Sequence, residues 1–358
     1  MINYNPELLE TFKNTDRTEI YGTDIVLKSI PEGIPSGLDP REKALFFKAA
    51  QNYKPAVTLQ DHRDATGFPA LNLNTKAVLT DKLTLESNGH SFDVWEYRLR
   101  RSNTAGHSAA LLYIHGGSFF AGSAQFMENL CKYICEEADC VVYNIEYSLA
   151  PEMPFPLGLN DCFETLDYVY NNAEKLGIDR NKICISGDSA GAGIAAAVAL
   201  NDEKRRISYM GLLYPCVLMD VADEAVPWRE EDFDIPKEER EIIVPRLRLG
   251  RSDGKGDEEF MMSIGFMYLG ENRQLCSDPR VSPLRAEIKS APKTTVITAE
   301  YDGLRPQGEV FARKLRETGA DVRCIRYRGV FHAFAEKLGY LPQAQDALLE
   351  IAQDIRSL

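Results

Sequence analysis

The chain has 358 residues, of which 44% are hydrophobic, so it is long enough to build one large α/β domain or two ordinary domains around a full core. Its formal net charge of −13 argues against nucleic acid or an anionic membrane surface as a partner, because both require basic patches. The first seven residues carry neither a basic stretch nor an apolar core, so we expect no signal peptide, and the longest apolar run, at residues 190–200, is far too short to span a bilayer.

The eight cysteines are scattered along the chain and contain no Cys-x-x-Cys pair. Several of them occupy strand-like or helix-like stretches as small apolar residues, which is typical of a reduced protein. We therefore expect a cytoplasmic protein without structural disulfides. No cluster of cysteine and histidine has the spacing of a metal site, so we expect neither a metal ion nor an organic cofactor.

Residues 1–75 show isolated apolar positions but no sustained alternation of polar and apolar residues, and prolines at positions 31, 35 and 40 interrupt them. We expect a helical and irregular N-terminal segment there. The pattern then changes, because residues 82–85 and 92–99 are strand-like and flank the turn residues Ser87-Asn88-Gly89. These residues predict a β-hairpin.

A continuous apolar strand is predicted at residues 109–114, and strands and helices alternate from there to the end of the chain. The other expected strands cover residues 140–145, the stretch directly before residue 189, and residues 209–214, 294–299 and 322–327. The expected helices cover residues 124–137, 157–176, 190–200, 306–318 and 343–355. This alternation predicts an α/β fold with a mostly parallel central sheet and helices on both faces.

Residues 217–280 interrupt the alternation of strands and helices. They combine clusters of charged residues with an apolar, helix-like stretch at residues 260–269, and they are too long for an ordinary crossover loop. We therefore expect an inserted subdomain at residues 217–280. The catalytic domain is then formed by residues 76–216 and 281–358, after an N-terminal segment at residues 1–75.

The motif Gly187-Asp188-Ser189-Ala190-Gly191 joins an apolar stretch to a run of small, helix-forming residues. A serine at a sharp turn between a strand and a helix is the context in which G-x-S-x-G marks a nucleophile. The helix N-terminus also directs free N–H groups toward an oxyanion formed at that serine. We predict that Ser189 is the nucleophile, and the alternative is a glycine-rich turn with an incidental serine.

A second glycine-rich loop, His115-Gly116-Gly117-Ser118, ends the strand at residues 109–114. Two adjacent glycines allow the backbone to approach a ligand and to direct its N–H groups toward it. We expect this loop to supply oxyanion donors together with the N–H of Ala190. We expect His115 to bond loop carbonyls, because the order for this chemistry is serine, then acid, then histidine, and His115 precedes the serine.

His332 fits that order, because it lies just beyond the last predicted strand, where active sites of α/β proteins gather. Asp302 lies beyond the end of the strand at residues 294–299, and a carboxylate there can accept the Nδ1 proton of His332. The alternative for Asp302 is a helix cap near Pro306. Glu300 is the rival acid, but it lies closer to the body of the strand, and we expect it to make a structural bond.

These motifs together resemble those of the hormone-sensitive lipase-like family of α/β-hydrolase carboxylesterases. The resemblance runs from about residue 83 to the end of the chain, through residues 115–117, 147–152, 154–156, 187–191, 278–284, 302–305 and 332–334. It implies an α/β-hydrolase fold with the catalytic residues Ser189, Asp302 and His332. It also implies a helical cap over the active site, built from the N-terminal segment and the insertion.

The chain departs from the family pattern at two positions. The family usually has a third glycine where this chain has Ser118, and it usually has a glycine where this chain has Ala333. The implied oxyanion donors are backbone N–H groups within Gly116, Gly117, Ser118 and Ala190. A serine can supply its N–H only if the backbone angle of the loop permits it.

The resemblance implies a serine esterase that acts on a small-molecule ester through an acyl-enzyme intermediate. An amidase or a lactonase on the same residues stays open, and so does a homodimer. A receptor that kept the fold and lost catalysis would lack one of the three catalytic residues, and all three positions are filled here.

We expect short acyl chains, from acetyl to about butyryl or hexanoyl, on the basis of three observations. Ser118 adds a side chain beside the oxyanion loop and two phenylalanines follow it at once, while the insertion is rich in charge rather than apolar like an interfacial lid. Against this reading, the apolar stretch at residues 260–269 could line a longer tunnel.

Overall fold

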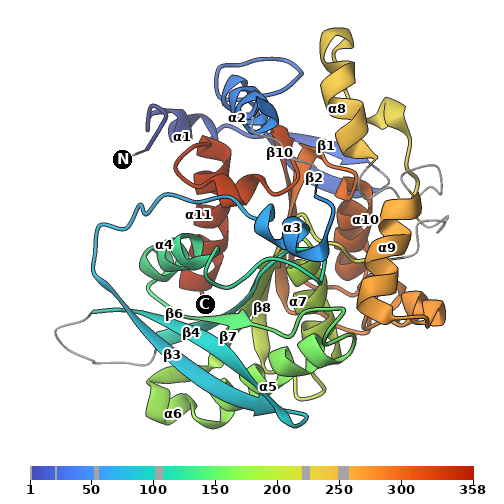
Figure 1. Ribbon diagram of the computed structural model, residues 1–358. Helices are drawn as coiled ribbons and strands as arrows, with labels where there is room; N and C mark the ends of the chain where they lie inside the picture. Colours follow the sequence, from blue (N-terminus) through green and yellow to red (C-terminus); the bar gives the residue numbers. More distant parts are fainter. Residues whose placement is uncertain (1, 21, 52–55, 101–107, 220–225, 249–257) are drawn as a thin grey trace.

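The computed structural model describes residues 2–20, 22–51, 56–100, 108–219, 226–248 and 258–358 (Figure 1). In this part of the chain one sheet of ten strands runs in the order β1-β2-β10-β9-β8-β7-β5-β6-β4-β3. The strands are β1 (Asp16–Ile20), β2 (Thr23–Lys28), β3 (Val78–Ser87), β4 (His90–Leu99), β5 (Ser108–Ile114), β6 (Val141–Glu146), β7 (Ile178–Asp188), β8 (Ile207–Leu213), β9 (Lys293–Tyr301) and β10 (Val322–Phe331).

The helices of the described residues lie on both faces of this sheet and beyond its edge. They are α1 (Leu8–Thr11), α2 (Pro40–Gln51), α3 (Leu59–Asp64), α4 (Glu128–Ala138), α5 (Leu157–Asn171), α6 (Ala173–Leu176), α7 (Ala190–Asn201), α8 (Arg240–Leu247), α9 (Glu258–Leu269), α10 (Arg305–Arg316) and α11 (Pro342–Arg356). Short 3-10 helices span Glu230–Asp232, Lys237–Glu239, Arg273–Ser277, Pro283–Arg285 and Phe334–Lys337.

The sheet is parallel in its centre and antiparallel at both ends. Neighbouring strands from β2 through β10, β9, β8, β7 and β5 to β6 are parallel, whereas β3 and β4 form an antiparallel hairpin that continues onto β6. The α/β fold predicted from the alternation and the predicted hairpin are therefore confirmed. Parallel strands place their carboxyl ends at one edge of the sheet, and the loops that follow β5, β7, β9 and β10 meet there.

The core has two layers, one on each face of the sheet. Side chains of β5 alternate between them, because Leu112 and Ile114 pack with α5, α7 and α10, whereas Leu111 and Tyr113 pack with α4 and α11. All four of these side chains are fully buried. A strand buried on both faces has a continuous apolar sequence, which is why residues 109–114 could be recognised from the sequence.

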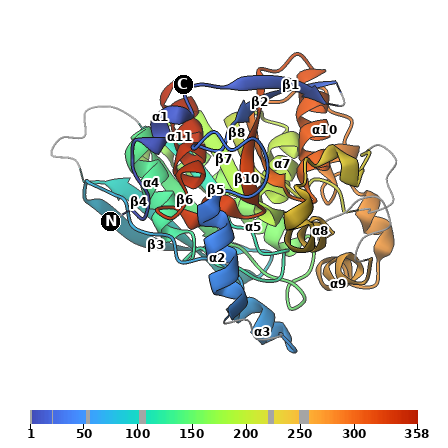
Figure 2. The ribbon, with the colours of Figure 1, turned by 90° about the horizontal axis from the view of Figure 1, so that it is seen from above.

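The N-terminal segment differs from our expectation of a purely helical and irregular cap. Strands β1 and β2 form an antiparallel pair at the edge of the sheet, and Val26 of β2 pairs in parallel with Ile325 of β10. Strands β1 and β2 therefore extend the sheet instead of covering the active site. Helices α2 and α3, from later in the same segment, lie on the same side of the molecule as α8 and α9 (Figure 2).

The insertion at residues 217–280 contains α8, α9 and three of the short 3-10 helices within its described residues. Its residues Trp228, Phe233, Ile243 and Leu247 form a small third core together with Tyr301 and other neighbours. The insertion thus packs on the carboxyl end of β9, close to the loop that carries Asp302. The division of the chain into a catalytic domain and two cap segments stays a prediction.

Candidate active site

Ser189 lies at the sharp turn between β7 and α7. Its backbone has φ 54° and ψ −121°, a conformation that is strained for a residue with a side chain. The backbone N–H of Ser189 donates to Leu213 O at 2.9 Å, which ties the turn to the neighbouring strand. A Cβ atom on Gly191 would lie 2.2 Å from Ile114 O, so only glycine permits this close approach between the turn and β5.

The side chains of Ser189, His332 and Asp302 form a continuous chain of hydrogen bonds. His332 Nε2 lies 2.9 Å from Ser189 Oγ, and His332 Nδ1 lies 2.7 Å from Asp302 Oδ2. The other carboxylate oxygen of Asp302 accepts the N–H of Leu304 at 2.9 Å, and Asp302 is buried. Because an ionised carboxylate only accepts, Nδ1 carries the proton and Nε2 is free to accept the Ser189 hydroxyl.

The surroundings of His332 also adjust its basicity. Burial by itself would lower the pKa of His332, but the negative charge and the hydrogen bond of Asp302 raise it, and the net shift is upward from the ordinary value of 6.5. The ring also makes an edge-on contact with Tyr214, with centroids 4.9 Å apart. A base with a raised pKa accepts a proton from an attacking hydroxyl more readily.

Three backbone N–H groups near Ser189 have no protein acceptor. Among the described residues, the N–H groups of Gly117, Ser118 and Ala190 donate to no other group. Gly116 is different, because its N–H donates to Asp188 Oδ1 at 3.0 Å. Our inclusion of Gly116 as an oxyanion donor is therefore wrong, since its N–H is already used.

The loop that carries these donors has an unusual backbone. Gly117, Ser118 and Phe119 have φ angles of 123°, 55° and 67°. A Cβ atom on Gly117 would lie 2.0 Å from Ala121 O, so a glycine is required at that position. Ser118 adopts the left-handed conformation despite its side chain, which is the conformation that the third glycine of the family pattern favours.

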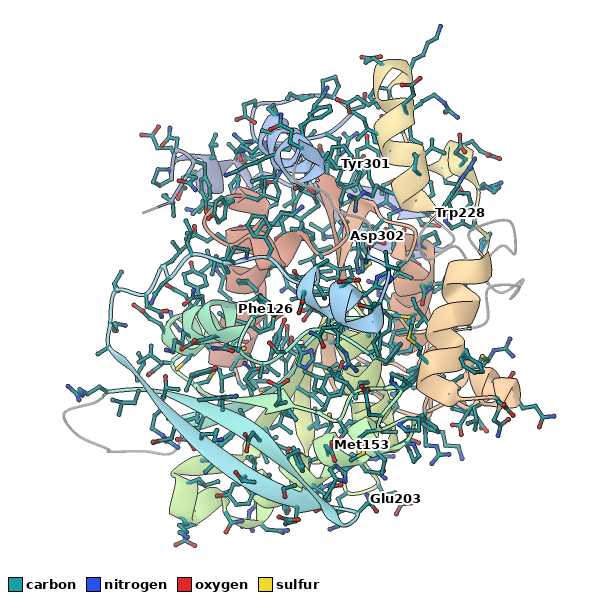
Figure 3. The ribbon with its side chains drawn as sticks, viewed as in Figure 1. Phe126, Met153, Glu203, Trp228, Tyr301 and Asp302 are labelled. Carbon is teal, nitrogen blue, oxygen red and sulfur yellow. The ribbon has the colours of Figure 1, made fainter. Side chains whose placement is uncertain are left out.

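A cavity of about 260 Å³ opens directly above Ser189. Both the insertion and the sheet supply its walls, and the lining residue Tyr301, at the end of β9, is labelled in Figure 3. The lining residues are Ser118, Phe119, Ser189, Ala190, Cys216, Met219, Arg246, Ile264, Tyr301, Leu304, Phe331, His332 and Ala333. The wall is mostly apolar, as is typical of a small-molecule site, and Arg246 is its charged member besides His332.

Glu300 and His115, which the sequence analysis set aside, lie in structural positions. Glu300 accepts hydrogen bonds from Arg328 Nε at 3.0 Å and from the N–H of Gly329 at 2.8 Å. His115 is fully buried, and its Nδ1 donates to Gly116 O at 2.7 Å, as expected for a histidine that bonds a loop carbonyl. Burial lowers the pKa of His115 to about 4, so this ring is neutral.

Two carboxyl groups beside the site, the buried Asp188 and the partly exposed Glu336, were not identified from the sequence. Asp188 accepts the Tyr113 hydroxyl at 3.0 Å as well as the Gly116 N–H, and burial raises its pKa to about 6. Burial and then the charge of Asp188 raise the pKa of Glu336 to about 8. The only signal for Asp188 was its place inside the motif of Ser189, whereas Glu336 had none.

A second group of serine, histidine and aspartate lies outside the cavity. His90 Nε2 is 2.9 Å from both Asp161 Oδ1 and Ser148 Oγ. Both partners contact the same ring nitrogen, so the ring cannot take a proton from Ser148 while Asp161 holds the opposite nitrogen. This group therefore lacks the geometry of a nucleophile with its base.

Among the residues that the structure describes, no group of three or more histidine, cysteine and acidic side chains is arranged to hold a metal ion. Likewise, within those residues no helix is both long and apolar enough to cross a membrane.

This fold and this site are those of an α/β hydrolase, and comparisons with known proteins agree. The family model described as the α/β hydrolase fold matches residues 111–336. The chain belongs to this family, the hormone-sensitive lipase-like carboxylesterases among the α/β hydrolases.

Individual relatives and solved structures narrow the activity. The chain is 30% identical over 240 residues to an arylesterase of Saccharolobus solfataricus, covering 66% of this chain and 70% of the relative. It is 26% identical to an ethyl acetate hydrolase of Pseudomonas putida, covering 78% of this chain and 82% of that protein. The structure of a Pyrobaculum calidifontis esterase superposes with a TM-score of 0.72 at 27% identity, covering 89% of this chain and 98% of the other. The chain is therefore a carboxylic ester hydrolase.

Proposed function

We propose that the chain is a serine esterase that hydrolyses short-chain esters through an acyl-enzyme intermediate. The observation that carries this proposal is the hydrogen-bonded series Ser189, His332 and Asp302 beside backbone N–H groups without a protein acceptor. A nucleophile within reach of its base, which is oriented by a third group, is the arrangement that acyl transfer requires.

In the proposed mechanism Ser189 Oγ attacks the ester carbonyl while His332 Nε2 takes the hydroxyl proton. Asp302 holds the proton on Nδ1 and stabilises the imidazolium that forms. His332 then gives its proton to the leaving alkoxide, which departs as an alcohol and leaves an acyl group on Ser189. Water, deprotonated by His332, attacks the acyl-enzyme, and the carboxylic acid leaves as the free serine returns.

The developing oxyanion is stabilised in this proposal by the N–H groups of Gly117, Ser118 and Ala190. Each N–H points from a backbone that is fixed by the turn or the loop, so the donors are organised before the substrate binds. Ala190 is the first residue of α7, and its N–H belongs to the groups that a helix cannot satisfy internally.

The size of the cavity supports a short acyl group. Its volume of about 260 Å³ is at the low end for a small-molecule site, and Met219 and Ile264 of the insertion help to enclose it. The ethyl acetate hydrolase among the relatives acts, by its name, on a small ester, which supports the same proposal. A cap built from α8 and α9, a cytoplasmic location and a homodimer also stay proposals.

The test combines covalent labelling with substitution of Ser189 by alanine. We expect a fluorophosphonate probe to label the protein on Ser189, and we expect Ser189→Ala to fold normally and to lose roughly 10⁴-fold in kcat. A labelled peptide that contains another serine, with activity lost, would refute the assignment. Comparison of esters with matched amides and lactones distinguishes the esterase from the two alternatives on the same residues.

A further inference from the structure

One arginine of the insertion lies at the wall of the active-site cavity. Arg246 belongs to α8 and lines the cavity together with Ser189 and His332. Apart from His332, the other side chains that the structure places at the cavity are uncharged. A guanidinium keeps its charge at every physiological pH, so this wall carries a permanent positive charge.

Aromatic rings contact Arg246, and among the described residues no carboxylate neutralises it. Its guanidinium carbon lies 5.1 Å from the centre of the Phe46 ring and 5.9 Å from that of Phe331. In the described ranges it forms neither an ion pair nor a side-chain hydrogen bond. Arg240, on the same helix, shows the usual arrangement, because it pairs with Glu230. The five N–H donors of Arg246 are thus available to a ligand.

Arg246 contacts the part of the cavity wall at which, in the proposed mechanism, the leaving alcohol receives its proton. Phe331, on which its guanidinium stacks, directly precedes His332 in the chain, and both line the cavity. In the proposed mechanism the leaving oxygen must lie at His332 Nε2, which gives that oxygen its proton. The alcohol part of the ester thus leaves from the part of the cavity wall that contains His332, and Arg246 contacts the neighbouring residue of this wall, Phe331.

We propose that Arg246 selects esters whose alcohol part carries a carboxylate. This inference rests on the proposed esterase function and adds the substrate class. A planar guanidinium binds a carboxylate through two parallel hydrogen bonds, and the contacts with the Phe46 and Phe331 rings restrict the position of this guanidinium before a substrate binds. The protein as a whole is strongly acidic, with a net charge of −13, so a local positive charge is needed to hold an anionic substrate.

The experiment compares matched charged and neutral esters. Para-acetoxybenzoate carries a carboxylate on its alcohol part, and para-acetoxybenzamide is its neutral counterpart of nearly the same shape. The mono-p-nitrophenyl ester of adipic acid and its methyl diester form a second pair, with the carboxylate on the acyl part. For each pair, the ratio of kcat/KM for the charged ester to that for the neutral ester is measured in the wild-type chain and in three variants.

Arg246→Gln removes the charge, Arg246→Lys keeps the charge without the planar fork, and Arg248→Gln is the matched control. Arg248 lies at the end of the same helix, is exposed and does not line the cavity. We expect Arg246→Gln to lower the acetoxybenzoate ratio about tenfold, mainly through KM, as for one charge-assisted contact of an exposed side chain. The ratio of Arg246→Lys should lie between those of Arg246→Gln and the wild type. The ratio of Arg248→Gln should equal that of the wild type.

Three results would overturn the proposal: an unchanged ratio in Arg246→Gln, an equal fall in Arg248→Gln, or a fall confined to the adipate pair. The last would place the carboxylate on the acyl side. Hydrolysis of the neutral esters shows that each variant is folded and active. If Ser189→Ala hydrolysed all four esters as fast as the wild type, the proposed function itself would fail, which is a separate outcome.

Discussion

Replacement of Asp302 by asparagine tests the proposed role of the acid through the position of one proton. Asp302 Oδ1 accepts the N–H of Leu304 at 2.9 Å, so the oxygen of an asparagine amide should keep that place. The amide NH₂ would then face His332 Nδ1, where Oδ2 accepts at 2.7 Å in the wild-type chain. A donor there forces Nδ1 to act as the acceptor and moves the proton to Nε2.

A protonated Nε2 cannot accept the hydroxyl proton of Ser189, so His332 no longer acts as a base. The positions of the three side chains are kept, because asparagine has nearly the shape of aspartate. We expect kcat of Asp302→Asn to fall roughly 10⁴-fold at pH 7, which corresponds to about 5.5 kcal/mol in activation free energy. The assay is steady-state hydrolysis of p-nitrophenyl acetate, with unfolding in urea measured in parallel. Stability should change little, because both hydrogen bonds of the side chain can be replaced.

Glu300→Gln is the matched control, since Glu300 is a buried carboxylate at the end of the same strand. The substitution removes the negative charge that accepts hydrogen bonds from Arg328 Nε and from the N–H of Gly329. We expect its unfolding free energy to fall by about 2–4 kcal/mol and its kcat to stay within about tenfold of the wild type. The reverse pattern, with Glu300→Gln inactive and Asp302→Asn active, would refute the assignment of the acid.

Three further predictions concern pH, stability and chain length. Since the base must be neutral and the pKa of His332 is raised, kcat/KM should fall on acidification with a midpoint above 6.5, and a midpoint below 6.5 would contradict this role. Because the pKa of Glu336 rises from 4.5 to about 8 on folding, its ionisation destabilises the protein as pH rises through that range. Glu336→Gln should therefore be more stable than the wild type by a few kcal/mol in urea at pH 8 and similar to it below pH 4.5, and an equal difference at both pH values would disprove it. For p-nitrophenyl esters, kcat/KM should rise about fourfold per methylene, as expected for about 0.8 kcal/mol each, and stop rising by about six carbons, whereas a maximum at decanoate would refute the short-acyl proposal.

The centre of the fold could be predicted from the sequence because its signals are local. Strand β5 is a continuous apolar run, and β7 leads directly into the motif of Ser189. The positions of Asp302 and His332 just beyond β9 and β10 follow from the rule that parallel strands bring their carboxyl ends together. Each of these inferences needed only a pattern within about ten residues.

The edge of the sheet could not be predicted, because its strands depend on distant partners. Strand β1 has the sequence Asp-Arg-Thr-Glu-Ile and is mostly exposed, so no apolar alternation marks it. Strand β2 is held by β10, about 300 residues further along the chain, a pairing that no local pattern reveals. The contacts of Arg246 with Phe46 and Phe331 also join residues that lie far apart in the sequence. Sequence patterns therefore located the residues of the proposed catalytic series better than the residues of the cavity wall around them.

The two departures from the family pattern concern the same physical property of the backbone. Ser118 has φ 55° and Ala333 has φ 62°, both in the left-handed region that favours glycine. A residue with a Cβ atom costs about 1–2 kcal/mol there, so the chain keeps these side chains against a local penalty. Both residues line the cavity. Ser118 belongs to the glycine-rich loop after β5, and Ala333 directly follows His332. Two added side chains at these places narrow the space beside the reacting carbonyl, which argues that strain in the backbone is retained here to limit the size of the ester.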